Sequence, residues 1–174
     1  VPRYHLLSSP AGLAAAAAEV AFPLIVKPVD NQSGQGVSRL SAADGLDAAY
    51  RLARSCSRSG EVLVESCVEG QEIIVDGFVV AGKARILGIA HKLPFADSPT
   101  VSSRILYRGA LSDAEFERIR ATVCATLSAL GLLDGIFHAE FMLDGEHIVP
   151  IDIAARGGGA MIYTHVLPHV SGVN

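Results

Sequence analysis

Two apolar runs and the turn between them read FHAEFMLDGEHIVPIDIAAR over residues 137–156. The Asp144-Gly145 pair is a strong signal for a β-hairpin turn, so strands are expected near 136–143 and 147–154. Glu140 and Asp152 are acidic residues inside these otherwise apolar strands. A carboxylate in such surroundings needs a partner. The two acids are therefore the first candidates for a functional site, with two unrelated surface carboxylates as the alternative.

The register of this hairpin determines whether the two carboxylates share a face of the sheet. A two-residue loop of Asp144 and Gly145 pairs Glu140 with Val149 and places Asp152 on the face opposite to Glu140. A three-residue loop that extends to Glu146 pairs Glu140 with Pro150, and Asp152 then becomes a same-face diagonal neighbour about 7–8 Å away by Cβ. That span suits a hydrated Mg²⁺. Pro150 cannot donate a ladder hydrogen bond, so an irregularity is expected in its strand.

Working outward, the pattern of apolar residues predicts an α+β chain of hairpins and helices. Strands are expected near 24–26, 37–40, 61–68, 71–80 and 84–91, and helices after Ser9-Pro10, after Ser41 over 42–57, after Ser112 over 113–130, and near 160–168. Residues 93–103 contain two prolines and three serines without periodicity. They are expected to form a long loop.

Length and composition narrow the class of protein. The 174 residues are half apolar, which allows one domain or two small lobes around a sizeable core. A net charge of −4 argues against a nucleic-acid or anionic-membrane surface. The apolar segment 6–26 contains Glu19 and is bracketed by Pro10 and Pro23, so it does not read as a membrane-spanning helix. The three cysteines lack metal-ligand spacing and suit a reducing compartment, for which we expect the cytoplasm.

A polar loop between two predicted strands is a second candidate site. It consists of Ser33, Gly34, Gln35, Gly36 and Val37. Because it joins two strands, it is neither a Walker loop nor a dinucleotide fingerprint. Its glycines would let backbone N–H groups approach an anion, and Lys27 at the end of the preceding strand could supply a cation. Glycine in such a turn is more often simply a turn residue.

Five motifs in this order resemble the ATP-grasp ligases, above all the carbamoyl-phosphate-synthase-like and carboxylate–amine ligase branches. They are Lys27-Pro28, the loop 33–37, the segment 64–72, His138-Ala139-Glu140 and the segment 151–156. The resemblance covers nearly the whole chain from Phe22 onward. It implies an α+β ATP-grasp fold of two α+β lobes with the nucleotide site between them. Residues 1–21 would be a linker and helix, 22–68 the small lobe and 69–174 the C-terminal lobe, and an N-terminal domain of the parent protein would lie outside this sequence.

The resemblance implies a nucleotide-binding role for residues of the first three motifs. Lys27 would contact the α and β phosphates of ATP, and the loop 33–37 would close over them. The backbone of Glu65 and Val68 would meet the adenine, and Glu72 would bind the ribose hydroxyls.

It also implies a set of metal-binding and catalytic residues. Glu140 and Asp152 would hold Mg²⁺ or Mn²⁺, and Arg156 would stabilise the transferred phosphoryl group. Lys92 is similar to a second phosphate-binding lysine, with a solvated strand-end lysine as the alternative. The family usually has glutamate and asparagine where this chain has Asp152 and Ala154, and Ala154 cannot bind a metal.

Three functions remain open from the sequence. The first is an ATP-dependent ligase that phosphorylates a small-molecule carboxylate with Mg-ATP and passes the acyl-phosphate to an amine, its site completed by the N-terminal domain. The second, suggested by Ala154, is an ATP-binding module that does not catalyse. A structural or interaction domain is the third, and it leaves the acids and Lys27 unexplained. We expect no nucleic-acid or membrane partner, and a homo-oligomer stays open. His138 could support Glu140, although a core histidine is the simpler interpretation.

Overall fold

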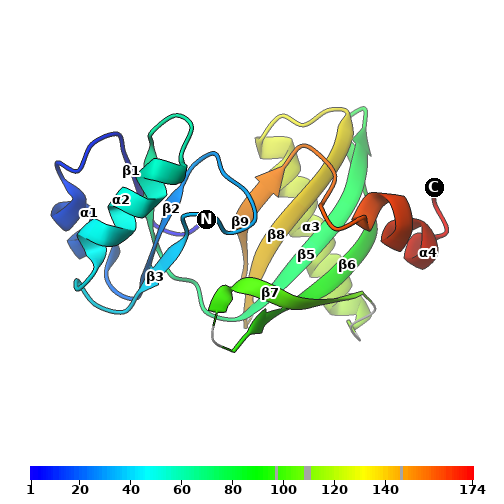
Figure 1. Cartoon of the computed structure of the whole chain (residues 1–174). Helices are drawn as coiled ribbons and strands as arrows, with labels where there is room; N and C mark the ends of the chain where they lie inside the picture. The colour runs from blue at the N-terminus through cyan, green and yellow to red at the C-terminus, as the bar shows by residue number, and fades with distance from the viewer. Residues whose placement is uncertain (97, 108–110, 146) are drawn as a thin grey trace. The chain divides into compact units, whose positions relative to one another are not determined.

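The computed structural model describes residues 1–96, 98–107, 111–145 and 147–174. The chain forms two compact units, one of Val1–Val68 with Pro94–Ser102 and one of Glu69–Leu93 with Ser103–Asn174. Helices combine with a four-stranded and a five-stranded sheet, so the predicted α+β class is confirmed (Figure 1).

The first unit contains the four-stranded sheet, whose strand order is β1-β4-β2-β3. Its strands are β1 (Tyr4–Leu7), β2 (Leu24–Pro28), β3 (Ser38–Leu40) and β4 (Val62–Ser66), and its helices are α1 (Leu13–Val20) and α2 (Leu46–Cys56). Leu46, Ala49, Tyr50 and Ala53 of α2 are buried in one cluster with residues of α1, β2 and β4, as their helical spacing predicts. Both helices begin after a glycine in the left-handed conformation, not after Ser9 or Ser41 as predicted.

The second unit contains most of the five-stranded sheet, whose order is β7-β6-β5-β8-β9. The strands are β5 (Gln71–Val80), β6 (Lys83–Phe95), β7 (Ser98–Tyr107), β8 (Gly135–Asp144) and β9 (His147–Ala154). The helices are α3 (Asp113–Ala129), the π-helical turn η1 (Ile162–Val166) and α4 (Leu167–Ser171). Helix α3 begins with the predicted cap at Ser112, which forms a reciprocal capping box with Glu115.

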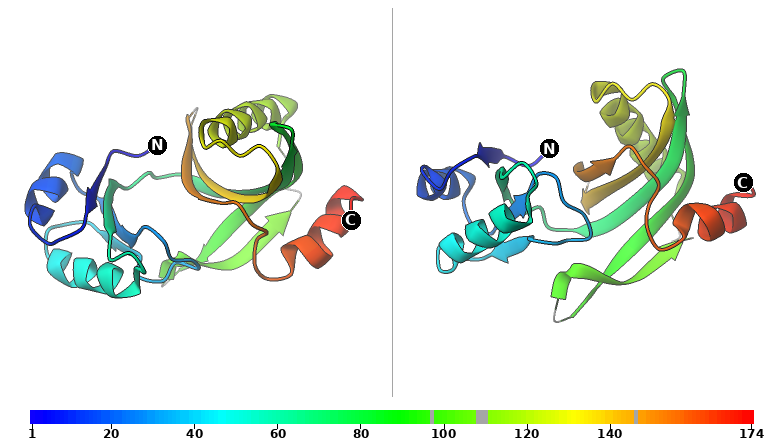
Figure 2. Two further views of the ribbon diagram at one scale, coloured as in Figure 1. Left: turned by 90° about the horizontal axis from the view of Figure 1, so that it is seen from above. Right: turned by 45° about the horizontal axis from the view of Figure 1, so that its top comes forward.

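The five-stranded sheet has an apolar and a polar face. Ile119, Val123 and Leu127 of α3 pack on odd-numbered residues of β5 and β8, such as Ile73 and Phe137, and Figure 2 shows α3 against one side of these strands. Side chains alternate along a strand, so the even-numbered residues lie on the opposite side. That side, the polar face, includes Glu72 and Asp76 of β5, and His138 and Glu140 of β8.

The predicted loop over 93–103 was wrong. Strand β6 continues through Phe95, and β7 begins at Ser98 and forms the edge of the sheet; Asp97 lies outside the described residues. The two prolines of this segment misled the prediction. Pro99 lies in the edge strand β7, which tolerates a residue that cannot donate a ladder hydrogen bond, whereas Pro94 lies one residue before the end of β6. Among the described residues, no helix is long and apolar enough to cross a membrane.

Candidate functional site

Glu140 and Asp152 lie directly opposite each other in the β8–β9 ladder. The register shifts between Glu140 and Phe141, where β9 carries one extra residue. Without this bulge, Asp152 would pair with Ala139 and face the core. The bulge turns it to the polar face beside Glu140, a known use of bulges near functional sites.

Neither predicted register of this hairpin was correct. Asp144 pairs with His147, and Gly145 forms a turn between them; Glu146 lies outside the described residues. The expected irregularity does occur: Pro150 lies next to the bulge. Its strand β9 is an edge strand, where proline is tolerated. The shared face of the two acids therefore follows from the bulge and not from the length of the turn.

Lys92 joins Glu140 to Glu72 on the polar face. Its Nζ lies 2.6 Å from Glu72 Oε1 and 3.1 Å from Glu140 Oε1. Burial alone would lower the pKa of Lys92, but the two carboxylates outweigh burial and raise it. Burial likewise favours a neutral Glu140, and the nearby His138 and Lys92 reverse this and lower its pKa to about 2. The structure thus brings together three predicted site residues, with Lys92 and Glu140 in their charged forms.

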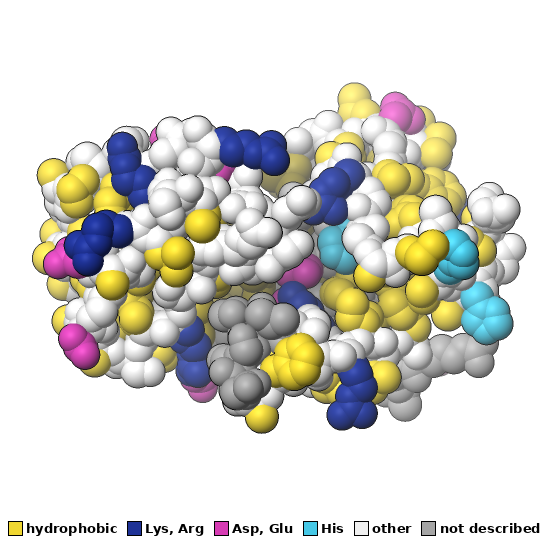
Figure 3. All heavy atoms as spheres, viewed as in Figure 1, with side chains coloured by type: hydrophobic (Ala, Val, Ile, Leu, Met, Phe, Trp, Pro, Cys, Tyr) yellow, Lys and Arg dark blue, Asp and Glu magenta, His cyan; other side chains and the backbone are white. Residues whose placement is uncertain are grey.

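Burial raises the pKa of Glu72, although Lys92 acts in the opposite direction. Figure 3 shows basic, acidic and histidine side chains grouped at the surface over β8 and β9.

Asp76 is a polar-face residue that the sequence analysis missed. It is completely buried, and its two oxygens accept hydrogen bonds of 2.7 Å from His138 Nδ1 and from the Tyr107 hydroxyl. Burial lowers the pKa of His138, but the hydrogen bond to Asp76 and the charge of Glu140 together raise it to about 9. The signal was present, because Asp76 interrupts an apolar strand in the same way as Glu140 and Asp152 do.

Lys27 forms an ion pair with Glu65 in the first unit. The pair joins neighbouring strands β2 and β4, with 2.6 Å between Lys27 Nζ and Glu65 Oε1. Glu65 is buried, and a buried acid needs such a partner. Val68, the second predicted adenine contact, follows the end of β4 and is partly buried.

The loop 33–37 forms two consecutive turns in the first unit. Gln35 and Val37 donate backbone hydrogen bonds to the carbonyls of Gln32 and Gly34, and Gln32–Gln35 are exposed. A Cβ atom on Gly36 would lie 2.8 Å from Cys56 Cβ, so glycine is required where the loop approaches the end of α2. The base of the loop is held there by Asn31, whose side chain donates to the Cys56 carbonyl.

Arg156 and Ala154 lie at the end of β9. Arg156 is exposed and donates to the carbonyl of Gly157 over 2.8 Å. Ala154 lies opposite His138 in the ladder. Among the described residues, no group of three or more His, Cys, Asp or Glu side chains could hold a metal ion. Glu140 and Asp152 fit a divalent cation as two carboxylate donors on one face, and the oxygens of a bound phosphate or water would have to complete the coordination.

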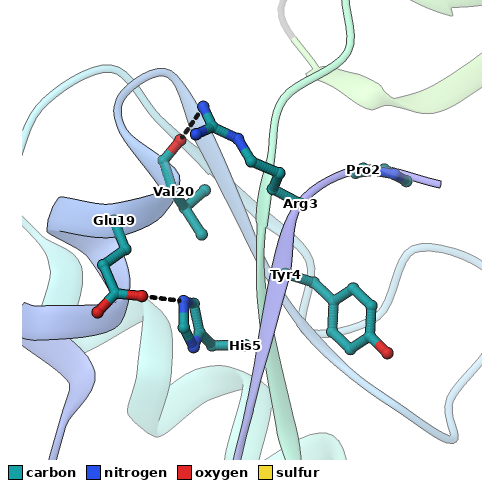
Figure 4. Close-up of a pocket in the computed structure, with 6 residues that line it drawn as sticks. All are labelled: Pro2, Arg3, Tyr4, His5, Glu19 and Val20. Carbon is teal, nitrogen blue, oxygen red and sulfur yellow. Dashed lines mark hydrogen bonds and ion pairs between the residues drawn. The ribbon is translucent and has the colours of Figure 1, made fainter.

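A hollow of about 540 Å³ lies elsewhere, in the first unit (Figure 4). His5 pairs with Glu19 at 2.9 Å, and Arg3 donates to the backbone carbonyl of Val20. The six residues that line it, Pro2–His5, Glu19 and Val20, include none of the predicted site residues. The hollow therefore does not mark the predicted site.

Comparison with known proteins identifies the family. Residues 20–165 match the family model of the ATP-grasp domain, and the chain therefore belongs to the ATP-grasp family, as its motifs predicted. The chain is 32% identical over 129 residues to the ATP-grasp enzyme fsqD of Aspergillus fumigatus, a match that covers 68% of this chain and 22% of that protein. It is also 32% identical over 138 residues to a D-alanine–D-alanine ligase of Ectopseudomonas mendocina, covering 75% of this chain and 43% of the relative.

Solved structures share the fold. An L-amino acid ligase from Bacillus licheniformis superposes with a TM-score of 0.82 at 23% identity, covering 100% of this chain and 41% of that one. A D-alanine–D-alanine ligase from Bacillus anthracis, solved in complex with ATP, gives a TM-score of 0.72 at 20% identity and covers 99% and 52%. The chain thus spans about half or less of the length of these relatives.

Proposed function

We propose that this chain is the nucleotide- and metal-binding part of an ATP-dependent ligase that joins a small-molecule carboxylate to an amine. The observation that carries the proposal is the direct pairing of Glu140 with Asp152 beside Lys92, in a chain of the ATP-grasp family. The names of similar proteins, D-alanine–D-alanine ligase and L-amino acid ligase, support this class of reaction.

The predicted nucleotide-binding residues would act as follows. Lys27 would exchange part of its interaction with Glu65 for the phosphates, and the exposed turns of the loop 33–37 would offer backbone N–H groups to them. The backbone around Glu65 and Val68 would contact the adenine. Glu72 would accept hydrogen bonds from the ribose hydroxyls while Lys92 turns toward phosphate.

Glu140 and Asp152 would hold Mg²⁺ or Mn²⁺, which neutralises phosphate charge when it is bound. The chain's own contribution to the reaction is positioning and electrostatic stabilisation. Lys92 and the exposed guanidinium of Arg156 would stabilise the phosphoryl group that moves from ATP to the carboxylate. The amine would then attack the acyl-phosphate carbon, and inorganic phosphate would leave. We expect a further domain of the same protein to help select the acid and the amine.

One observation favours a second candidate, an ATP-binding module that does not catalyse. Ala154 offers no metal ligand, and its cross-strand neighbour His138 is bound to Asp76. The retention of Arg156 argues for the enzyme, because a binding module has no need of it. Release of ADP that depends on both a carboxylate and an amine would distinguish the two.

Thermal unfolding with ATP alone, Mg²⁺ alone and both together tests the proposal. A ligand at about 100 times its Kd should stabilise the protein by about 2.7 kcal/mol, which raises the melting temperature by several degrees. We expect this shift to require both components and to be lost in Asp152→Asn. The matched control is Asp144→Asn, the same change at the exposed end of the same hairpin, which should keep the shift. A melting temperature that no combination raises would contradict the nucleotide assignment.

A further inference from the structure

A chain of polar contacts crosses the polar face of the second unit and ends at Glu140. It begins at the Tyr107 hydroxyl, which donates to Asp76 over 2.7 Å. Asp76 accepts from His138 Nδ1 at the same distance. The other ring nitrogen of His138, Nε2, lies 3.8 Å from Glu140 Oε1. The direction of the ring, and with it the position of Nε2, is therefore fixed from behind by Asp76.

Burial makes this arrangement costly for stability alone. Asp76 has no exposed surface, and removing a carboxylate from water costs several kcal/mol even where partners compensate part of it. Apolar side chains of similar volume would fill the same space more cheaply. A structural core histidine explains why His138 is satisfied, but not why a buried acid holds it beside Glu140.

Two glycines provide the space that the chain of contacts needs. A Cβ atom on Gly158 would lie 2.6 Å from His138 Nδ1, and one on Gly88 would lie 3.0 Å from the Tyr107 ring. Gly158 follows β9 and Gly88 lies within β6, so four strands, β5 to β8, and the segment after β9 converge on Asp76 and its two donors. The next residue, Gly159, has no heavy atom within 4 Å of its Cβ position.

We propose that His138 is a positioning residue that orients the Glu140 carboxylate for the divalent cation, and that Asp76 and Tyr107 hold the His138 ring in place. The inference rests on the proposed function, because it assigns a role relative to the metal-binding carboxylate. Glu140 is held from two sides, by Lys92 at 3.1 Å and by His138 at 3.8 Å. Loss of an outer partner of a metal-binding carboxylate typically costs 10–100-fold in metal affinity.

The adjacent glycines give a matched pair of variants for the test. Gly158→Ala pushes the His138 ring without changing any polar group, whereas Gly159→Ala adds the same methyl group in open space. His138→Asn is the third variant, because its side-chain amide can still reach Asp76 but not Glu140. The measurement is binding of a non-hydrolysable ATP analogue by the protein, titrated with Mg²⁺ and with Mn²⁺, together with the melting temperature of each variant.

We expect Gly158→Ala and His138→Asn to raise the metal concentration at half-maximal nucleotide binding about tenfold or more. Gly159→Ala should match the wild type, and analogue affinity without metal should stay unchanged in all three. If either test variant does not fold, the other decides. If Gly158→Ala and His138→Asn show the same metal dependence of nucleotide binding as the wild type, this inference is wrong and the proposed function is unaffected. A wild type whose nucleotide binding ignores the metal would overturn both.

Discussion

The Lys27–Glu65 pair allows a quantitative prediction about the first unit. The two side chains are 2.6 Å apart and only 16% and 9% exposed, and they join adjacent strands. Removing one partner of a buried ion pair costs about 3–5 kcal/mol, because the other charge stays buried without compensation. The small remaining exposure favours the lower end, so we expect Lys27→Met, which leaves the Glu65 carboxylate buried, to lower the free energy of unfolding by about 3 kcal/mol. Glu65→Gln should cost less, because Lys27 has a further interaction besides the one with Glu65.

The double variant separates the pair from the rest of the fold. Replacing both charges of a buried pair by groups of similar shape is often nearly neutral. We therefore expect the double variant Lys27→Met/Glu65→Gln to be more stable than Lys27→Met, with a coupling energy of about 2 kcal/mol or more. Urea unfolding followed by circular dichroism measures all four proteins. Single-variant costs that add within about 0.5 kcal/mol would refute the reasoning.

The same set of variants tests nucleotide binding without confusion from stability. If Lys27 contacts the phosphates, the double variant should bind ATP as weakly as Lys27→Met although it is more stable. Calorimetric titration with ATP, with and without Mg²⁺, measures this. ATP affinity that follows stability across the set would remove Lys27 from the phosphate site.

Three further predictions concern single positions. Glu72→Ala should reduce the preference for ATP over 2′-deoxy-ATP in competition binding, and an unchanged ratio would exclude Glu72 from the ribose contact. Gly36→Ala should destabilise the protein by more than the roughly 1–2 kcal/mol that a left-handed alanine costs, because the added Cβ also meets Cys56. Gly12→Ala is the control, since Gly12 also has a positive φ but open space around its Cβ position. Urea unfolding of the control should show the backbone strain alone. Ser112→Ala removes the cap of α3 and should cost about 1 kcal/mol, whereas a cost near zero would mean that the capping box adds no stability.

Periodicity predicted those elements whose buried side is continuous. The stripe of Phe116, Ile119, Val123 and Leu127 predicted α3, and all of these residues except the exposed Phe116 form its buried face. The alternation in β5 predicted its bounds, Gln71–Val80, for the same reason. Both patterns are set by contact with a core, which leaves a regular trace in the sequence.

The hairpin register could not be predicted from the same signal. Ile148 and Ile153 both pack against the core, although an uninterrupted strand would put them on opposite faces. The extra residue beside Pro150 resolves this conflict through a bulge. Alternation on each side of the bulge is regular, so the pattern predicts the strand but not the position at which it changes phase.

Asp76 was missed for a different reason. Glu140 and Asp152 were noticed as two acids on the two apolar strands of one predicted hairpin, whereas Asp76 has no acid on the partner strand of its predicted hairpin and lies in a strand that matches no motif beyond its first residues. Its partners, His138 and Tyr107, are 62 and 31 residues away in the sequence. Partners at such separations meet through the strand order of the sheet, which pairwise motifs do not encode.

Lys92 provides the last prediction, which has opposite signs for two ligands. Its ammonium group neutralises Glu72 and Glu140 in the structure. A divalent cation that approaches Glu140 without nucleotide must compete with this charge, since two cations within a few ångströms repel each other. With ATP present, we expect the ammonium group to bind phosphate instead, and the same lysine then favours the metal–nucleotide complex.

Lys92→Met should therefore strengthen the binding of Mn²⁺ alone and weaken the binding of Mn²⁺ together with ATP. Electron paramagnetic resonance of free Mn²⁺ measures the first, and titration of ATP at fixed Mn²⁺ measures the second. Lys83→Met is the matched control, because Lys83 is exposed at the start of the same strand and should change neither affinity. If both affinities fall in Lys92→Met, the ammonium group helps the carboxylates to bind the metal and does not compete with it. The proposal that Lys92 moves from the carboxylates to the phosphates is then wrong. If both rise, Lys92 makes no phosphate contact, and its place among the catalytic residues is lost.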